Sequence, residues 1–340
     1  MESTAELNGT LGIAQIGVGY WGPNLLRNLV ANKNCKVRKV IDITPARLKY
    51  VEQNYPDIKR SANVDDIFDD PEIQAVVITT PAATHFQLAI RALKAGKHVL
   101  VEKPMATTVD EIQQIKLLAN EKNLIAMAGH TFLYNSAVIF LKELIKSGEL
   151  GDIRYIYSQR LNLGRIRSDV DALWNFAPHD ISIIQFLLDD VRPVSVQKQG
   201  MDYVQNGIDD VVFMNLVYPD KIMAHIHVSW LDPHKIRRMT IVGTKKMVVY
   251  DDGADNKITI YDKGIDLMAE LGKNMDFDNP ALVRFNYRSE DILLPKVNFV
   301  EPLKAEVNHF FDCILNGTKC RSDAEHAQKV VEILCEADSV

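Results

Sequence analysis

The first forty-two residues constrain the fold most, because they combine two short apolar runs, a glycine-rich turn, a helix-like segment and an acid in a fixed order. The turn is Gly17-Val18-Gly19-Tyr20-Trp21-Gly22, and the acid, Asp42, comes twenty residues after its last glycine. Dinucleotide-binding βαβ units have this order and spacing, since their glycines form a tight turn that lets the backbone approach a pyrophosphate. The predicted cofactor-binding residues of this unit are Gly17, Gly19, Tyr20, Trp21, Gly22 and Asp42.

Asp42 also indicates which dinucleotide would bind. Its carboxylate would accept hydrogen bonds from the adenosine ribose hydroxyls and repel a 2′-phosphate, which favours NAD over NADP. The N-terminus of the helix after the turn would offer unpaired N–H groups to the phosphates. The alternative is a glycine-rich turn of another α/β protein with an incidental acid, and the intact order of elements disfavours it.

The N-terminal part of the chain alternates between strand and helix patterns. The apolar runs cover residues 11–16, 37–41, 75–79, 98–101 and 125–128, and the helical patterns lie near residues 23–31, 45–55, 84–95 and 108–122. This alternation predicts an α/β fold with a doubly wound parallel sheet, a Rossmann domain. We assign residues 1–129 to this NAD-binding domain.

After Gly129 the pattern changes. A helix near residues 136–147, a strand at 153–163 and a helix near 176–188 lead into a series of strands with no helices between them. These strand candidates are residues 194–199, 210–218, 222–230, 236–242, 246–251 and 257–262. Such a series predicts an antiparallel meander. We expect residues 264–302 to be irregular and two helices, 303–315 and 322–338, to complete a second domain of residues 130–340.

Composition narrows the classes of partner. The 340 residues suffice for two domains, and 47% hydrophobic with 25% charged residues is typical of soluble globular proteins. A net charge of -6, without clusters of Lys and Arg interleaved with aromatic residues, argues against a nucleic-acid partner. No apolar run approaches membrane-spanning length, and the polar first ten residues do not match a signal peptide.

The four cysteines favour a reducing compartment. Cys35, Cys313, Cys320 and Cys335 lack C-x-x-C spacing and are too sparse for a disulfide framework. We therefore expect reduced thiols in a cytoplasmic protein.

Polar residues that follow the predicted strands are the candidates for chemistry, because open α/β sheets bind ligands beyond the carboxyl ends of their strands. Three positions qualify: Thr79-Thr80-Pro81, Glu102-Lys103-Pro104 and His130. Lys103, directly after the run 98–101, could hold a substrate hydroxyl and the nicotinamide ribose together. The alternative is an exposed surface lysine.

Several of these motifs together resemble the Gfo/Idh/MocA family of sugar oxidoreductases. They are the glycine fingerprint, Pro81 with Thr84-His85, Ala95-Gly96-Lys97-His98-Val99 and Glu102-Lys103-Pro104. The resemblance implies a Rossmann domain joined to an α/β domain whose open, mostly antiparallel sheet often serves in oligomer contacts, so we expect a homodimer or homotetramer. It adds Thr80, Pro81, His85, Glu102 and Lys103 to the cofactor-binding residues.

The resemblance also implies a reaction. Family members transfer hydride between a nicotinamide and a hydroxyl-bearing carbon of a sugar or cyclitol. Lys103 would be the catalytic or positioning lysine, and the bond before Pro104 would be cis.

A second catalytic element of the family is an Asp with a His four residues later, at the start of a helix. Here His179 matches while Asn175 replaces the Asp. An Asp would raise the pKa of the imidazole, whereas Asn can only orient the ring. Asn175 also suits an N-cap with Pro178 in the first turn, where the helix dipole would keep His179 neutral and able to act as a base. We predict that Lys103, His179 and Asn175 are catalytic.

Further residues are candidates for substrate binding. His130, Tyr134 and Asn135 lie where the chain enters the second domain. Arg160, Arg165 and Arg167 could bind a carboxylate or pyrophosphate, or form surface ion pairs. Asn175 and His179 complete this set. His225, His227 and His234 could suggest a metal, but they lack a defined ligand spacing and suit a polar face or an interface better, so no metal is predicted.

These patterns together predict an NAD-dependent dehydrogenase. The segments 129–135 and 175–179 are most similar to family members that act on nucleotide-linked sugars, such as N-acetylated hexosamines or hexuronates. A dehydrogenase of a free cyclitol or aldose is the alternative enzyme. A non-catalytic NAD-binding sensor is the alternative from another class, because Asn175 departs from the family's dyad.

Overall fold

The computed structural model describes residues 10–269 and 283–339. Their contacts form two compact units. Unit 1 contains residues up to 135 and residues 300–335, and unit 2 contains residues 136–299 and the residues from 336 onward. The predicted domains were 1–129 and 130–340, so the prediction put residues 300–335 in the second domain, whereas their contacts place them in unit 1. Their division into a cofactor domain and a substrate domain stays a prediction.

Unit 1 is built on a six-stranded parallel sheet of order β3-β2-β1-β4-β5-β6. The strands are β1 (Leu11–Ile16), β2 (Cys35–Ile41), β3 (Lys59–Ser61), β4 (Ala75–Ile78), β5 (His98–Glu102) and β6 (Ala126–Gly129). The predicted doubly wound sheet is therefore confirmed. Strand β3 and the short helix α3 (Asp65–Phe68) were not predicted, because β3 is a polar three-residue edge strand with no apolar pattern.

Helices cover both faces of this sheet. Right-handed crossovers run from β1 to β2 through α1 (Gly22–Val30) and, in the opposite direction, from β4 to β5 through α4 (His85–Lys94), which places these helices on opposite faces. All six residues of β1 are buried as a result. Helices α2 (Pro45–Asn54), α5 (Val109–Glu121), α8 (Pro302–Asn316) and α9 (Ala324–Asp338) follow at or near their predicted positions.

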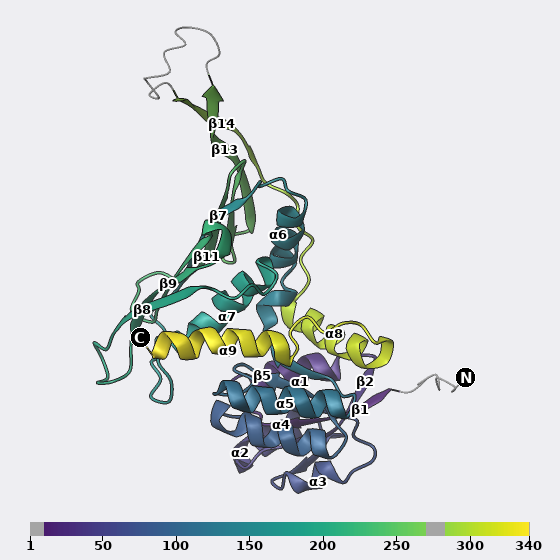
Figure 1. The fold of residues 1–340 in the computed structure, drawn as a ribbon. Coiled ribbons are helices and arrows are strands. Elements are labelled where there is room, and N and C mark those ends of the chain that lie inside the picture. The colour runs from purple at the N-terminus through teal and green to yellow at the C-terminus, as the bar shows by residue number, and fades with distance from the viewer. Residues whose placement is uncertain (1–9, 270–282, 340) are drawn as a thin grey trace. The chain divides into compact units, whose positions relative to one another are not determined.

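Unit 2 contains an eight-stranded sheet of order β14-β13-β12-β11-β7-β10-β9-β8 (Figure 1). Its strands are β7 (Ile153–Leu161), β8 (Ser195–Met201), β9 (Val211–Val217), β10 (Met223–Ser229), β11 (Ile236–Gly243), β12 (Met247–Asp251), β13 (Ile258–Ala269) and β14 (Val283–Leu293). Neighbouring strands are antiparallel except for β10 and β7, so the predicted meander is interrupted where β7 lies between β10 and β11.

Two helices accompany this sheet, α6 (Ser136–Lys146) and α7 (Ala172–Leu187). Helix α7 packs on β7, β9 and β10. The buried and exposed residues of β9 alternate strictly, as expected for a strand with one covered face. Phe213 on the other face is 42% exposed.

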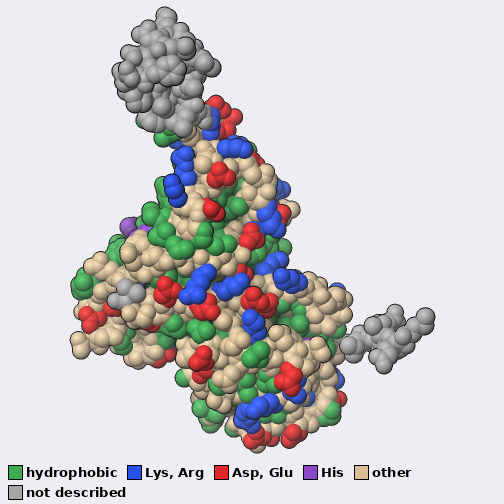
Figure 2. All heavy atoms as spheres, viewed as in Figure 1, with side chains coloured by type: hydrophobic (Ala, Val, Ile, Leu, Met, Phe, Trp, Pro, Cys, Tyr) green, Lys and Arg blue, Asp and Glu red, His purple; other side chains and the backbone are tan. Residues whose placement is uncertain are grey.

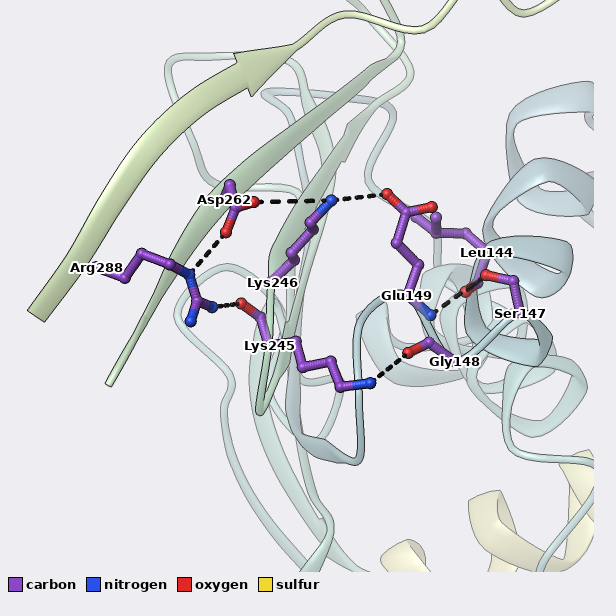
Figure 3. A network of polar contacts seen from close by, with 8 residues as sticks. All are labelled: Leu144, Ser147, Gly148, Glu149, Lys245, Lys246, Asp262 and Arg288. Atoms are coloured by element: carbon purple, nitrogen blue, oxygen red, sulfur yellow. Dashed lines mark hydrogen bonds and ion pairs between the residues drawn. The ribbon is translucent and has the colours of Figure 1, made fainter. Parts of the chain in front are cut away.

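The expectation that residues 264–302 are irregular is wrong for residues 264–269 and 283–293, which are in strands, and is confirmed for residues 294–301, which carry no helix or strand. Strand β13 continues to Ala269 and pairs with β14, while residues 270–282 lie outside the described residues. A charged contact joins the two strands of this hairpin (Figure 3): Arg288 Nε lies 2.9 Å from an oxygen of Asp262. Lys246 Nζ lies 2.9 Å from Glu149 and 3.8 Å from Asp262, which links the hairpin to the segment after α6.

None of the helices in the described ranges has the length and hydropathy needed to cross a membrane. On the face drawn in Figure 2, acidic and basic side chains are interspersed over both units.

Candidate active site

The carboxyl ends of four neighbouring strands of unit 1 lie at one edge of the sheet. Ile16 of β1 pairs with Ile78 of β4, which pairs with Val101 of β5, and Glu102 pairs with Gly129 of β6. The residues that follow these strands are the glycine turn, Thr79, Lys103 and His130. The parallel register therefore brings together the positions at which open α/β sheets bind ligands.

The three glycines of the turn have different surroundings. A Cβ atom on Gly17 would lie 2.8 Å from the carbonyl oxygen of Thr79, and one on Gly22 would lie 2.7 Å from that of Gly17. Gly17 also has a φ of +91°, which disfavours any side chain. Around Gly19 the nearest neighbour of a Cβ would be Arg47, at 3.7 Å. Two glycines thus allow tight packing and one leaves the backbone open, which fits a bound dinucleotide pyrophosphate.

A buried glutamine, which the sequence analysis missed, holds this turn. Gln15 Nε2 donates to the carbonyl oxygens of Gly17 and Gly22, each at 2.9 Å. Thr79 Oγ1 donates to the carbonyl oxygen of Gly17 at 2.5 Å. The sequence does contain a sign of this role, because Gln15 is a polar residue inside the first apolar run. A buried amide there needs hydrogen-bonding partners.

Asp42 lies at the glycine turn, as the fingerprint predicts. Its Oδ2 accepts the backbone N–H of Val18 at 2.7 Å, and its Oδ1 accepts that of Thr44 at 2.8 Å. Arg47, also missed by the sequence analysis, places Nη1 3.5 Å from Asp42 Oδ2 and is half exposed. The acid is the residue type that binds a ribose 2′-hydroxyl, and the neighbouring guanidinium is the type that accommodates a 2′-phosphate.

Lys103 follows β5 beside a buried acid. The Lys103 N–H donates to Glu102 Oε2 at 3.2 Å, the lysine is half-buried, and the Lys103–Pro104 bond is cis, as expected. Burial raises the pKa of Glu102 to about 7, against the opposing effects of the Lys103 charge and a hydrogen bond from Trp21. Tyr20 and Trp21 are exposed on the turn, 87% and 40% respectively.

His85 connects the end of β4 to the Lys103-Pro104 segment. Its Nδ1 lies 2.8 Å from the carbonyl oxygen of Pro104, and its Nε2 lies 2.8 Å from that of Thr80. Burial lowers the pKa of His85. The ring is 1% exposed, and because a neutral imidazole carries one N–H it donates to one of these two carbonyl oxygens at a time. Pro81, by contrast, is exposed.

Glu306 is a further buried acid of unit 1 that the sequence analysis did not single out. It lies on α8, and its Oε2 accepts from the Thr131 hydroxyl at 2.9 Å. Burial, together with the nearby charge of Glu102, raises the pKa of Glu306 well above its usual range. The position of Glu306 on the apolar face of α8 could have indicated a buried acid. Its partner, however, is far away in the sequence.

Three predicted substrate-binding residues are buried within unit 1. The Tyr134 hydroxyl is 2.8 Å from Ser322 Oγ, and burial raises the pKa of Tyr134 well above its usual range. The His130 ring packs edge-on against His326 at 5.5 Å between centroids. Asn135 is 2% exposed. Their contact with substrate stays a prediction.

In unit 2, helix α7 begins earlier than predicted. It starts at Ala172, and the N-cap is Asp171, whose carboxylate accepts the Trp174 N–H at 2.9 Å. The interpretation of Asn175 as the N-cap is therefore wrong, because an acid four residues earlier fills that role. His179 is likewise not in the first turn, so the helix dipole acts on it less.

Asn175 and His179 lie on the same helix, as predicted. The two residues are four positions apart in α7, so they lie one turn apart on the same face, and both are half-buried. Pro178 lies inside the helix. The catalytic roles of Asn175 and His179 stay predictions.

The three predicted arginines differ in their surroundings. Arg160 on β7 is buried, and its Nε lies 2.6 Å from Oδ2 of Asp180, the residue after His179. Ser158 Oγ donates to the other oxygen of this carboxylate at 2.6 Å. The partner of Arg160 is thus an acid of the protein itself. Arg167 pairs with exposed Asp169, and Arg165 is exposed.

Two of the histidines considered as metal ligands lie on β10. His227 stacks on Phe213 at 4.3 Å, and His225 stacks on Tyr157 at 5.3 Å, both between ring centroids. His225 Nδ1 also lies 2.7 Å from Asn215 Oδ1. His234 is exposed in the loop after β10. The two β10 histidines therefore belong to an aromatic cluster on the sheet.

Comparison with known proteins agrees with this geometry. Residues 11–130 match the model of an oxidoreductase family with an NAD-binding Rossmann fold, and residues 138–249 match the Gfo/Idh/MocA C-terminal domain. The chain is 31% identical over 136 residues to the NADP⁺-dependent scyllo-inositol 2-dehydrogenase of Bacillus subtilis, covering 40% of this chain and 37% of that protein. It is 30% identical over 195 residues to the UDP-N-acetylglucosamine 3-dehydrogenase of Acidithiobacillus ferrooxidans, covering 57% of this chain and 60% of that protein.

The alignments with these curated relatives span less than two thirds of the relatives' length. A solved structure of the Acidithiobacillus ferrooxidans enzyme matches with a TM-score of 0.77 at 23% identity, over 97% of both chains, which supports the fold. The two family models together cover more than half of the residues. The chain therefore belongs to the Gfo/Idh/MocA family of oxidoreductases.

Proposed function

We propose that this chain is a dehydrogenase that uses NAD to oxidise a secondary alcohol of a nucleotide-linked sugar, or to reduce the corresponding ketone. The observation that carries the proposal is the position of Lys103. The lysine directly follows β5, at the sheet edge that also carries the glycine turn and Asp42. A cation at this edge suits the orientation of a substrate oxygen beside a dinucleotide.

The proposed roles follow from the side chains. The turn 17–22 and Asp42 would hold the dinucleotide, whose nicotinamide supplies the hydride acceptor or donor when bound. Lys103 would hold the substrate oxygen, and buried His85 keeps the Lys103-Pro104 segment in place through its contact with the carbonyl of Pro104. His179 would exchange the hydroxyl proton, with Asn175 one turn earlier orienting the ring.

The substrate class rests on similarity. The relative that acts on UDP-N-acetylglucosamine supports a nucleotide-linked sugar, such as a UDP-linked N-acetylhexosamine or hexuronate. The inositol dehydrogenase relative supports the competing class, a free cyclitol or aldose. The presence of both Lys103 and His179 argues against a non-catalytic NAD-binding regulator.

The preference for NAD rests on Asp42, whose buried carboxylate faces the glycine turn. Arg47 beside it works in the opposite direction, since a guanidinium attracts a 2′-phosphate. We therefore propose NAD as the favoured cofactor, with NADP binding more weakly.

We further propose a cytoplasmic homo-oligomer, a dimer or tetramer, that associates through the open face of the unit 2 sheet. Phe213 on β9 and Met223 on β10 are 42% and 55% exposed on that sheet. Exposed apolar side chains of this kind are typical of self-association surfaces.

The experiment is a screen of UDP-sugars, free sugars and cyclitols for NADH and NADPH absorbance, followed by Lys103→Met on the best substrate. We expect turnover to fall by about 10²–10⁴-fold while NAD affinity, measured by calorimetry, changes little. Lys94→Met, at an exposed lysine of α4, is the control and should keep full turnover. Unchanged turnover in Lys103→Met would refute the role of this lysine.

A further inference from the structure

Three sulfur and nitrogen donors of unit 1 converge on a point that the proposed reaction does not use. They are His309 and Cys313 on α8 and Cys320 in the segment that follows, and their donor atoms all lie within 4.8 Å of one another. We propose that these three residues form a binding site for a thiophilic divalent cation, with zinc as the expected occupant.

The local fold explains why the donors meet. His309 and Cys313 are four residues apart on α8, so their side chains lie on the same face of the helix. Gly317 ends the helix in the left-handed conformation, with a φ of 66°. This turn reverses the chain and brings Cys320 back to the face that carries the other two donors.

The spacing of the donors suits a tetrahedral ion. Zinc bonds of about 2.3 Å to sulfur and about 2.0–2.1 Å to nitrogen, at a tetrahedral angle, place a sulfur and a nitrogen ligand about 3.5 Å apart. Cys313 Sγ and His309 Nε2 are 3.5 Å apart. Thiolate and imidazole are also the donors that zinc selects in proteins.

The surroundings favour a cation at this point. The Ser322 N–H donates to the Cys320 sulfur. The Cys320 thiol donates to the Cys313 sulfur. Asp312 and Asp323 add negative charge nearby. A metal ion would replace the proton that the two thiols share.

One existing hydrogen bond competes with the ion. The Arg321 N–H donates to His309 Nε2 at 3.0 Å, so an ion at that nitrogen must displace this bond. Three protein donors also leave a fourth position for water. We therefore expect weaker binding than in a closed four-ligand zinc site.

Occupancy would stabilise a segment that supports β6. Ser322 Oγ donates to the carbonyl of Ala128, and the Ala128 N–H donates to the carbonyl of Ser322. The same hydroxyl contacts Tyr134. An ion between α8 and Cys320 would restrain the chain just before these contacts.

The test is a titration of the reduced full-length chain with Co²⁺ under anaerobic conditions, followed by Zn²⁺. We expect one equivalent of Co²⁺ to produce thiolate charge-transfer absorption that Zn²⁺ abolishes. Cys320→Ser and His309→Gln should weaken binding at least about tenfold. Cys335→Ser, at a half-buried cysteine outside the cluster, is the matched control and should bind like the wild type.

A second measurement does not depend on how well the variants fold. In the wild type, Zn²⁺ should slow alkylation of Cys313 and Cys320 by iodoacetamide and leave the rate at Cys335 unchanged. The proposal is overturned if the reduced chain takes up no Co²⁺, if all variants bind equally, or if Zn²⁺ protects neither thiol.

Discussion

Asp180 of unit 2 and two buried glutamates of unit 1 have opposite surroundings. In unit 2, both oxygens of Asp180 are occupied, by the Arg160 guanidinium and by the Ser158 hydroxyl. In unit 1, Glu102 and Glu306 each leave Oε1 buried without a hydrogen-bond partner among the described residues. The first arrangement fixes α7 on β7, whereas the second leaves polar atoms unsatisfied at a cost in stability.

The difference indicates which acids serve the fold and which are available to a ligand. In Asp180 the guanidinium and the hydroxyl both bind the carboxylate inside the fold, so this acid acts in packing α7 against β7. A buried oxygen without a hydrogen bond lowers the stability of the fold. Where such an oxygen lies near the glycine turn and Lys103, a bound cofactor or substrate can supply the missing interaction. The predictions below test this contrast between paired and unpaired acids.

The largest effect is expected when the paired acid of unit 2 is removed. Asp180→Ala leaves the Arg160 guanidinium buried without its carboxylate, which should lower the free energy of unfolding by about 3–5 kcal/mol. Urea denaturation measures this change. Asp169→Ala, which breaks the exposed pair with Arg167, should cost no more than about 1 kcal/mol. Equal costs for the two variants would contradict the distinction.

A smaller and opposite effect is expected for an unpaired acid of unit 1. The pKa of Glu102 is about 7 in the folded chain, above the value of about 4.3 for an unfolded glutamate. Its contribution to stability is therefore fully present below about pH 4.3 and is lost as the pH rises through about 7. Glu102→Gln, which carries no charge, should gain roughly 1–3 kcal/mol relative to the wild type between those pH values.

Urea denaturation of the cofactor-free chain across that pH range checks this second prediction. Glu121→Gln, at an exposed glutamate of α5, is the control and should follow the wild type at every pH. A Glu102→Gln difference that stays constant with pH would show that this carboxyl does not titrate in the expected range.

The smallest effect concerns the acid that begins α7. Asp171→Ala removes the N-cap and should cost about 1 kcal/mol, whereas Asp171→Asn should keep the stability because Asn caps equally well. Thermal melts of both variants measure the change. A loss in Asp171→Asn as large as in Asp171→Ala would mean that the charge, and not the cap, stabilises the helix.

Local patterns predict unit 1 well. The glycine turn, the apolar runs and Asp42 all lie within a few residues of their observed elements, because each depends on short-range periodicity and turn chemistry. The position of Lys103 after β5 follows from the same pattern. The partners of Lys103 and of the other site residues do not follow from it.

The features that the sequence did not predict depend mainly on contacts between residues far apart in the chain. Glu306 reaches Thr131 from the C-terminal part of the chain, and buried Arg160 pairs with Asp180 from another element. The start of α7 was misplaced because two capping residues, Asp171 and Asn175, lie four positions apart and only the structure shows which is used. Strand β14 was missed although its sequence alternates, since Val283, Phe285 and Tyr287 are separated by polar residues.

The return of residues 300–335 to unit 1 has a consequence for synthesis of the chain. Residues up to 135 emerge from the ribosome with the complete parallel sheet, yet α8, which packs on α1, is made only after residues 136–299 of unit 2. The nascent N-terminal segment must therefore wait with part of its apolar surface uncovered, which is the condition under which chaperones bind and chains aggregate. A stop codon shortly before residue 300 would leave every strand of the parallel sheet intact and still deprive that unit of its final helices.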